Sequence, residues 1–281
     1  MNYRYGEYLK LAREISGEIG RIVSENAGNM REMGKKAFIG AYGAPTSRID
    51  ALAEERALEI IKESGMELNV LTEERGIINR SAAGACETLI LDPIDGTTNC
   101  IAGIPFYAVS VAFAKGDIGG KLSDVFFGYV KNLPANEEYI AAKGEGARLL
   151  TGGREIQILP ENAASAAESG AKPIRASVYL GSFAEPPEFL RKIRYLRSMG
   201  SASLEMCLVA KGALDFYYFH SAPEHRLRIV DIAASTLIAR ESGGVVLGEN
   251  GKELEMDIDL KDRKNLVAAR DKKVLEILES D

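Results

Sequence analysis

Histidine, cysteine, basic charge and long apolar runs are all scarce in this sequence of 281 residues. Only two histidines, His220 and His225, are available, so no triad built on histidine is apparent. The three cysteines, Cys86, Cys100 and Cys207, are few and widely spaced. We therefore expect free thiols in a reducing cytoplasm, not a disulfide framework.

The lack of apolar runs and of basic excess argues against membranes and nucleic acid as partners. No apolar run approaches the roughly 20 residues that a membrane span needs, and residues 1–10 lack the apolar core of a signal peptide. The net charge of −6 gives no electrostatic footprint for nucleic acid. We expect a cytoplasmic enzyme or binding protein. If it handles an anion, it needs local cations, either Arg and Lys or bound metal.

The periodicity of apolar residues predicts an α+β half, residues 1–165, followed by an α/β half, residues 166–281. In the first half we expect helices over 3–26 and from 47 onward, a glycine-rich loop over 27–44, and strands over 67–72, 88–91, 107–114, 125–131, 138–142 and 156–159. In the second half we expect strands over 174–180, 245–247 and 266–268, and helices over 187–195, 201–211, 232–242 and 272–279.

The most informative segment is residues 91–99, which read Leu-Asp-Pro-Ile-Asp-Gly-Thr-Thr-Asn. An apolar strand delivers Asp92 and Asp95 three residues apart, and Gly96 permits a sharp turn after them. Both carboxylates and the backbone carbonyl of Ile94 can then face one point. Hard oxygen ligands of this kind suit Mg²⁺.

Further candidate groups stand at the boundaries of other elements. Glu73 follows a predicted strand, whereas Asp50 and Asp231 lie near the starts of predicted helices. Taken singly, each is more often a helix cap or a solvated surface residue. After the turn, the N–H groups of Gly96 and Thr97 would be free to meet an anion.

Other phosphate chemistries fit the sequence poorly. Asp92 and Asp95 are three residues apart, whereas a haloacid-dehalogenase-type nucleophile stands two residues before its partner. A cysteine phosphatase needs Arg six residues after its Cys, and Cys100 is followed at that distance by Phe106. The sequence also lacks the glycine-rich Lys loop of P-loop nucleotidases.

Together these segments resemble the inositol monophosphatase superfamily. Residues 92–97 match its Asp-Pro-Ile-Asp-Gly-Thr signature, and residues 231–234 are similar to its second signature, an Asp followed shortly by two small residues. Residues 73–74 stand where the family has its Glu pair, and residues 46–50 resemble its Thr-x-x-x-Asp segment. The resemblance covers nearly the whole chain and is nearest to the archaeal type that acts on fructose 1,6-bisphosphate and inositol monophosphate.

This resemblance implies a layered αβαβα sandwich and a site that holds two or three Mg²⁺ ions, for which Mn²⁺ can substitute. It assigns the first ion to Glu73, Asp92 and the carbonyl of Ile94, and the second to Asp92, Asp95 and Asp231. Asp50 and Thr97 would orient the attacking water, and Glu73 would help to hold a third ion. The resemblance also implies a homodimer.

The expected substrate is a small phosphate ester, with fructose 1,6-bisphosphate first and inositol 1-phosphate close behind. Its expected contacts are Asp95, Gly96, Thr97, Gly200, Ser201, Ala202, Glu224, Arg226 and Asp231. Arg197, Arg226 and Arg228 could meet a second phosphate through bidentate guanidinium contacts. A 3′-phosphoadenosine 5′-phosphate phosphatase, or an inactive sugar-phosphate binding module on the same fold, remains an alternative.

Overall fold

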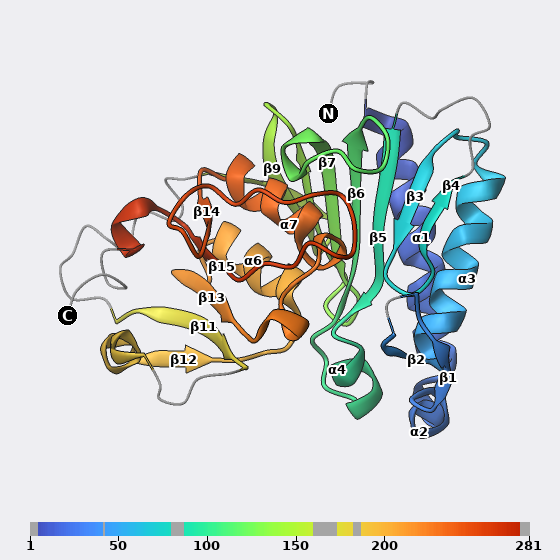
Figure 1. The fold of residues 1–281 in the computed structure, drawn as a ribbon, viewed down its shortest axis with the longest axis horizontal. Helices are drawn as coiled ribbons and strands as arrows, with labels where there is room; N and C mark the ends of the chain where they lie inside the picture. The colour runs from blue at the N-terminus through green and yellow to red at the C-terminus, as the bar shows by residue number, and fades with distance from the viewer. Residues whose placement is uncertain (1–4, 42, 80–86, 160–172, 182–186, 276–281) are drawn as a thin grey trace.

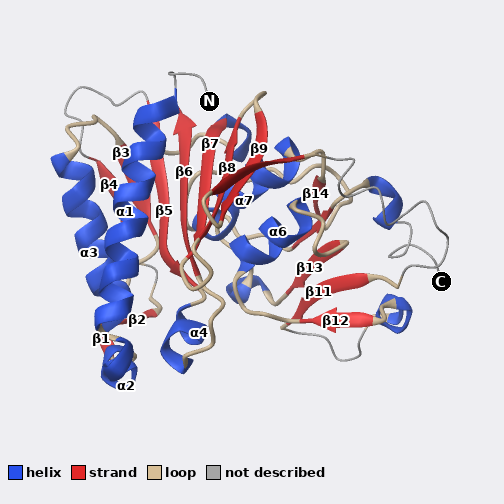
Figure 2. Cartoon of the chain, turned by 180° about the vertical axis from the view of Figure 1, so that it is seen from behind, coloured by secondary structure: helices blue, strands red, loops and turns tan. Residues whose placement is uncertain are grey.

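The chain folds into a layered α/β sandwich (Figure 1), as the sequence predicted. We describe it from a computed structural model that covers residues 5–41, 43–79, 87–159, 173–181 and 187–275. Two helices lie outside a large sheet, two further helices lie between this sheet and a smaller one, and short 3-10 turns lie beyond the smaller sheet (Figures 1 and 2).

The larger sheet has eight strands in the order β10-β9-β8-β7-β6-β5-β3-β4. Its strands are β3 (Asn69–Thr72), β4 (Gly76–Asn79), β5 (Glu87–Asp95), β6 (Ala108–Lys115), β7 (Val125–Asn132), β8 (Glu137–Ala142), β9 (Gly146–Thr151) and β10 (Arg154–Ile158). All neighbours are antiparallel except β3 and β5, which run in parallel. Because β3 and β5 are parallel neighbours and Thr72 pairs with Leu91, Glu73 and Asp92, which follow these residues, come at the same end of the two strands.

The smaller sheet has five strands in the order β12-β11-β13-β15-β14. Its strands are β11 (Arg175–Leu180), β12 (Tyr195–Arg197), β13 (Phe216–His220), β14 (Val245–Gly248) and β15 (Leu266–Ala269). A two-stranded ribbon, β1 (Lys36–Ile39) and β2 (Pro45–Ser47), completes the β-structure of the described residues.

Helices α1 (Gly6–Glu25) and α3 (Arg48–Glu63) cover the outer face of the larger sheet (Figure 2). Helix α1 is amphipathic and buries Leu11, Ile15 and Ile19 on one face, a spacing of four residues that places them in one stripe. Ser47 caps α3, where its hydroxyl accepts a hydrogen bond from the backbone N–H of Asp50. None of the described helices combines the length and the apolar character that crossing a membrane requires.

Helices α6 (Ala202–Ala210) and α7 (Ile229–Glu241) lie between the two sheets and are buried on nearly every side. Helix α7 packs across β6, β7 and β8 at a point where these strands carry small residues. There Gly128 of β7 lies between Ala112 of β6 and Ala141 of β8, so the helix backbone comes close to the strands. A Cβ atom at Gly128 would lie 2.7 Å from the carbonyl oxygen of Ala234.

Several predicted elements were wrong or incomplete. Residues 27–44 are not simply a loop, because they contain a 3-10 turn (Ala27–Asn29), the short helix α2 (Met30–Met33) and β1. The helix predicted over 187–195 is only a 3-10 turn (Glu188–Lys192), because the next residues form β12 and pair with β11. Strands β2, β4, β9, β12 and β13 were not predicted, and α7 begins three residues earlier than expected.

The end of the chain was predicted as a helix over 272–279, but its described part is a 3-10 turn (Lys272–Leu275). The predicted boundary over 161–172 lies outside the described residues. Cys100 and Cys207 are free, as predicted, and both are buried, whereas Cys86 is not among the described residues.

Candidate active site

Strand β5 carries the two carboxylates of the first signature into the interior. Asp92 and Asp95 are 2% and 8% exposed, and the pairing of β5 with β6 shifts register between them. This irregularity is a bulge, which redirects side chains that a regular strand would point to opposite faces. The backbone N–H of Ile94 donates to Asp92 Oδ1 at 3.0 Å. The sequence predicted that a turn makes both carboxylates face one point, whereas the structure continues strand β5 through a bulge as far as Asp95.

Carboxylates from three distant segments converge beside this bulge. One oxygen each from Glu73, Asp92 and Asp231 lies within 4.8 Å of the others. Glu73 directly follows β3, Asp92 lies on β5 and Asp231 lies in the first turn of α7. Three buried or half-buried oxygen donors at this spacing suit a hard divalent cation such as Mg²⁺.

The carboxylates of the cluster lie close together in a buried site, and both the burial and the neighbouring negative charges shift their pKa values. Burial raises the pKa of Asp92 well above its ordinary value, and the charges of Glu73 and Asp95 raise it further. Burial likewise raises the pKa of Asp231, an effect that Arg228 opposes. This crowding favours the protonated form of Asp92 when no cation is bound, whereas a cation would stabilise the ionised form.

Arg228 supplies the positive charge that contacts this cluster directly. Its Nη2 lies 3.1 Å from Asp231 Oδ1 and also donates to Glu73 Oε1. Its backbone N–H donates to Asp231 Oδ2 at 2.7 Å, which caps the start of α7. Burial raises the pKa of Glu73, but the charge and hydrogen bond of Arg228, together with Asp92 and Arg263, outweigh this effect and leave the pKa below its ordinary value.

Asp50 and Thr97 lie together, as the family pattern predicted. Thr97 Oγ1 lies 2.9 Å from Asp50 Oδ1 and 3.0 Å from the carbonyl oxygen of Ile94. Burial raises the pKa of Asp50 to about 6, and the charge of Glu73 contributes to the increase. An acidic group with such a pKa can accept or release a proton near neutral pH.

Asp95 is bound to the start of α6 by one of its oxygens. Asp95 Oδ2 accepts hydrogen bonds from Ser201 Oγ at 2.7 Å, from the backbone N–H of Ser203 at 2.7 Å, and from Ser203 Oγ. Burial nevertheless raises the pKa of Asp95 to about 7. This carboxylate thus serves as the cap of α6, and its Oδ1 is the oxygen left to act as a ligand.

The segments that contain Gly96 and Gly200, both predicted to contact the substrate, lie against each other. Gly96 has a φ of +96°, and a Cβ atom there would lie 3.1 Å from the carbonyl oxygen of Gly200. Asn99 Nδ2 donates to the carbonyl oxygen of Met199 at 2.6 Å. Glycine is therefore required at position 96 both by the left-handed conformation and by the close approach.

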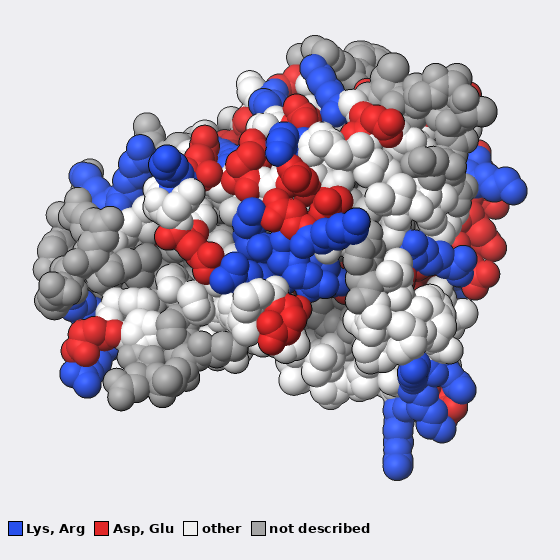
Figure 3. Space-filling view, in the orientation of Figure 1, with Lys and Arg blue, Asp and Glu red and all other residues white. Residues whose placement is uncertain are grey.

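A cavity of about 280 Å³ opens beside these groups. Its lining includes Asp50, Glu73, Glu74, Thr97, Arg228 and Arg263, together with residues of the β1–β2 ribbon. In the space-filling view, Lys and Arg side chains form a band at the centre of one face, with Asp and Glu side chains around it (Figure 3). The cavity lining itself combines two arginines, Arg228 and Arg263, with the carboxylates of Asp50, Glu73 and Glu74.

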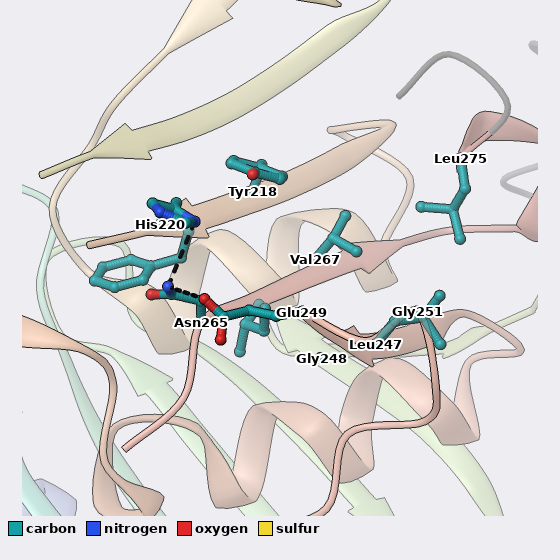
Figure 4. Close-up of a pocket in the computed structure, with 11 residues that line it drawn as sticks. Tyr218, His220, Leu247, Gly248, Glu249, Gly251, Asn265, Val267 and Leu275 are labelled. Atoms are coloured by element: carbon teal, nitrogen blue, oxygen red, sulfur yellow. Dashed lines mark hydrogen bonds between the residues drawn. The ribbon is translucent and has the colours of Figure 1, made fainter. Parts of the chain in front are cut away.

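Two further predicted substrate contacts, Glu224 and Arg226, do not line this cavity. Glu224 is exposed on a 3-10 turn (Pro223–His225), and its backbone carbonyl accepts a hydrogen bond from Arg263. Arg226 forms an ion pair of 3.2 Å with Glu249. Glu249 lines a second pocket of about 320 Å³ on the smaller sheet, where His220 and Asn265 also lie (Figure 4). None of the described carboxylates of the cluster lines that pocket.

Sequence reasoning missed two side chains of the site and gave a third a different role. Ser203 could have been found, because it stands in the first turn of a helix that follows the recognised Gly-Ser pair. Arg263 carries no local signal, since it reaches the cavity from an irregular segment. Arg228 was interpreted as a contact for a second phosphate, whereas the structure finds it paired with carboxylates.

Comparisons with known proteins agree with this geometry. The sequence model of the inositol monophosphatase family matches residues 5–280. A fructose-1,6-bisphosphatase/inositol-1-monophosphatase of Methanothermobacter thermautotrophicus is 35% identical over 276 residues, which cover 95% of this chain and 92% of that protein. A bifunctional NADP phosphatase/NAD kinase of Methanocaldococcus jannaschii is 34% identical over 94% of this chain, which matches 48% of that longer protein.

The fold is also that of solved structures. The crystal structure of an inositol monophosphatase–fructose 1,6-bisphosphatase superposes with a TM-score of 0.77 at 30% sequence identity, and the match covers 99% of this chain and 98% of that one. A protein of Pyrococcus horikoshii with similarities to inositol-1 monophosphatase superposes with a TM-score of 0.78 at 27% identity, covering 98% of both chains. The likeness therefore extends over both sheets and the helices between them.

Proposed function

The chain belongs to the inositol monophosphatase family, and from this premise we infer that it hydrolyses small sugar or polyol phosphates with Mg²⁺ as cofactor. Proteins of this family are metal-dependent phosphoric monoester hydrolases, so the enzyme class follows from membership. The observation that supports the proposal best is the convergence of Glu73, Asp92 and Asp231 within 4.8 Å.

The proposed ligands are those that the family resemblance implies. Glu73, Asp92 and the carbonyl of Ile94 would hold one ion, and Asp92, Asp95 and Asp231 a second. Bound Mg²⁺ would neutralise the phosphoryl charge, lower the pKa of water and stabilise the leaving oxygen. The protein supplies the positions of these oxygens: the bulge in β5 aims Asp92, and α6 holds Asp95 by hydrogen bonds to its Oδ2.

Asp50 and Thr97 are the proposed residues for handling the proton of the attacking water. The Thr97 hydroxyl lies within hydrogen-bonding distance of both Asp50 Oδ1 and the Ile94 carbonyl, so it can be turned toward either. With its pKa raised to about 6, Asp50 is ionised at neutral pH yet basic enough to accept a proton. Direct attack by water requires no covalent intermediate on the protein.

For the substrate we propose fructose 1,6-bisphosphate and inositol 1-phosphate, on which several relatives are named to act. Gly96, Thr97, Gly200, Ser201, Ala202, Glu224 and Arg226 stay predictions as its contacts. A nucleotide 2′- or 3′-phosphate is the second candidate, because a relative of similar identity is named an NADP phosphatase. A homodimer and a cytoplasmic location also stay predictions.

The decisive experiment is a phosphate-release assay with Mg²⁺ and then with EDTA. Fructose 1,6-bisphosphate, inositol 1-phosphate, 3′-phosphoadenosine 5′-phosphate and NADP should be tested side by side. We expect Mg²⁺-dependent release from the first two. Release from a nucleotide alone would favour the second candidate. Binding of all four without any release of phosphate would refute catalysis and leave an inactive binding module.

A further inference from the structure

The guanidinium of Arg228 occupies a position between two carboxylates that we propose as metal ligands. It contacts Glu73 Oε1 and, at 3.1 Å, Asp231 Oδ1, while its Nε lies 3.4 Å from Asp231 Oδ2. The side chain of Arg228 is only 17% exposed, so water screens these contacts weakly. Arg228 thus joins the end of β3 to the start of α7.

Charge balance explains why a cation belongs at this position. Glu73, Asp92 and Asp231 bring their oxygens within 4.8 Å of one another, and like charges at such a distance repel strongly in a buried site. Among the described residues, Arg228 alone forms ion pairs with members of this cluster. Arg263 lies near enough to influence Glu73 and Asp231, but it makes no ion pair with either in the described part of the chain.

One proposed ion takes Glu73 as a ligand and the other takes Asp231, so each would bind a carboxylate that Arg228 now contacts. The guanidinium cannot keep full contact with these carboxylates while divalent ions bind them, because the positive charges repel each other. This inference rests on the proposed metal site. We propose that Arg228 is the counter-ion of Glu73 and Asp231 in the metal-free protein. It holds Glu73 and Asp231 in position before metal binds, and it leaves Glu73 when the ion enters. Arg228 is therefore a positioning residue that competes with the metal.

The test is a calorimetric titration of Mg²⁺ into metal-free protein, comparing Arg228→Gln with the wild type. The variant keeps a polar side chain of similar length but lacks the competing charge. We expect its apparent dissociation constant for Mg²⁺ to fall at least about tenfold, because close charge pairs remain strong at the effective dielectric of a protein. Its melting temperature in EDTA should fall, and its stabilisation by Mg²⁺ should exceed that of the wild type.

Arg263→Gln is the matched control, since it removes the same charge from the same cavity without removing an ion pair to the cluster. We expect it to strengthen Mg²⁺ binding by no more than about threefold, through long-range repulsion alone. Equal gains in the two variants would overturn the inference, because net charge would then explain both. Unchanged or weaker binding in Arg228→Gln would also overturn it, because Arg228 and the ion would then be bound together.

Arg228→Lys keeps the proposal testable if Arg228→Gln fails to fold without metal. A lysine ammonium is a compact charge that lacks the guanidinium fork, so it holds one carboxylate less effectively when it contacts the other. We expect a gain in Mg²⁺ affinity between those of the other two variants, and no gain would refute the proposal. Calorimetry separates this result from turnover. Phosphatase activity with unchanged affinity in the Arg228 variants refutes only the counter-ion, whereas a wild type that binds no divalent ion refutes the metal site as well.

Discussion

Gly128 should control the position of Asp231 although the two residues do not belong to the same element. Gly128 lies in β7, and a Cβ atom there would lie 2.7 Å from the carbonyl oxygen and 3.1 Å from the Cα of Ala234. Both are backbone atoms of α7, so no side-chain rotation can relieve the contact. In Gly128→Ala, the helix must move away from the sheet by about half an ångström to restore an ordinary contact distance.

The expected loss of stability is that of an overpacked core, about 1–3 kcal/mol. For a chain of this size, that corresponds to a fall of roughly 2–10 °C in melting temperature. The helix that moves also carries Asp231, which lies three residues before Ala234. Misplacing a catalytic group by as much as 1 Å can cost about a hundredfold in rate, so a half-ångström shift should lower kcat by about tenfold.

The assay combines thermal unfolding in EDTA with phosphate release in saturating Mg²⁺ at 25 °C, where the variant remains folded. Gly17→Ala is the control. Gly17 lies on the exposed side of α1 and a Cβ there meets no atom within 4 Å. Removing a glycine from a helix should stabilise the protein by about 0.5–1 kcal/mol and leave kcat unchanged. A Gly128→Ala protein with wild-type melting temperature and activity would show that α7 does not rest on the β7 backbone.

Three further predictions concern the site itself. Asp92→Asn should lower kcat by about a thousandfold or more, because metal ions supply several kcal/mol of transition-state stabilisation. Its unfolding midpoint in EDTA should equal or exceed that of the wild type, and a lower midpoint would contradict the charge crowding around Asp92. Ser203→Ala removes one of two hydroxyls that hold Asp95, so kcat/KM should fall about tenfold, as expected for the loss of a hydrogen bond to a charged group. Unchanged kinetics would show that the hydroxyl of Ser201 suffices to hold Asp95. Burial and the charge of Glu73 raise the pKa of Glu74 to about 7. The folded metal-free protein therefore keeps a proton that the unfolded chain releases near pH 4.5. As a result, the free energy of unfolding should fall as the pH rises from about 4.5 to 7. In Glu74→Gln, urea unfolding in EDTA across this range should show a slope shallower by up to about 1.4 kcal/mol per pH unit, and an unaltered slope would count against this titration.

Local sequence patterns predicted the elements whose patterns are strong. The amphipathic α1 and the strand that ends in the first signature both follow from neighbouring residues. Strand β12 could not be predicted, because only its pairing with β11 makes Tyr195–Arg197 extended. The early start of α7 depends on the capping interaction between Arg228 and Asp231, which the helical period does not reveal.

The same distinction applies to the candidate site, where sequence patterns predicted some contacts and the packing of distant segments determines the others. Spacing placed Asp92 and Asp95 together, and the family pattern placed Asp50 beside Thr97. The ion pairs of Arg228 and the hydrogen bonds from Ser203 to Asp95 join residues far apart in the chain. Which partner a buried charge finds depends on how the layers pack, and a single sequence does not state that packing.

Because α7 both lies between the two sheets and brings Asp231 to β5, the proposed metal site depends on a late part of the chain. Synthesis from the N-terminus produces Glu73, Asp92 and Asp95 well before residues 229–241. The cluster of Glu73, Asp92 and Asp231 can therefore be complete only after α7 has been made and has packed against the larger sheet.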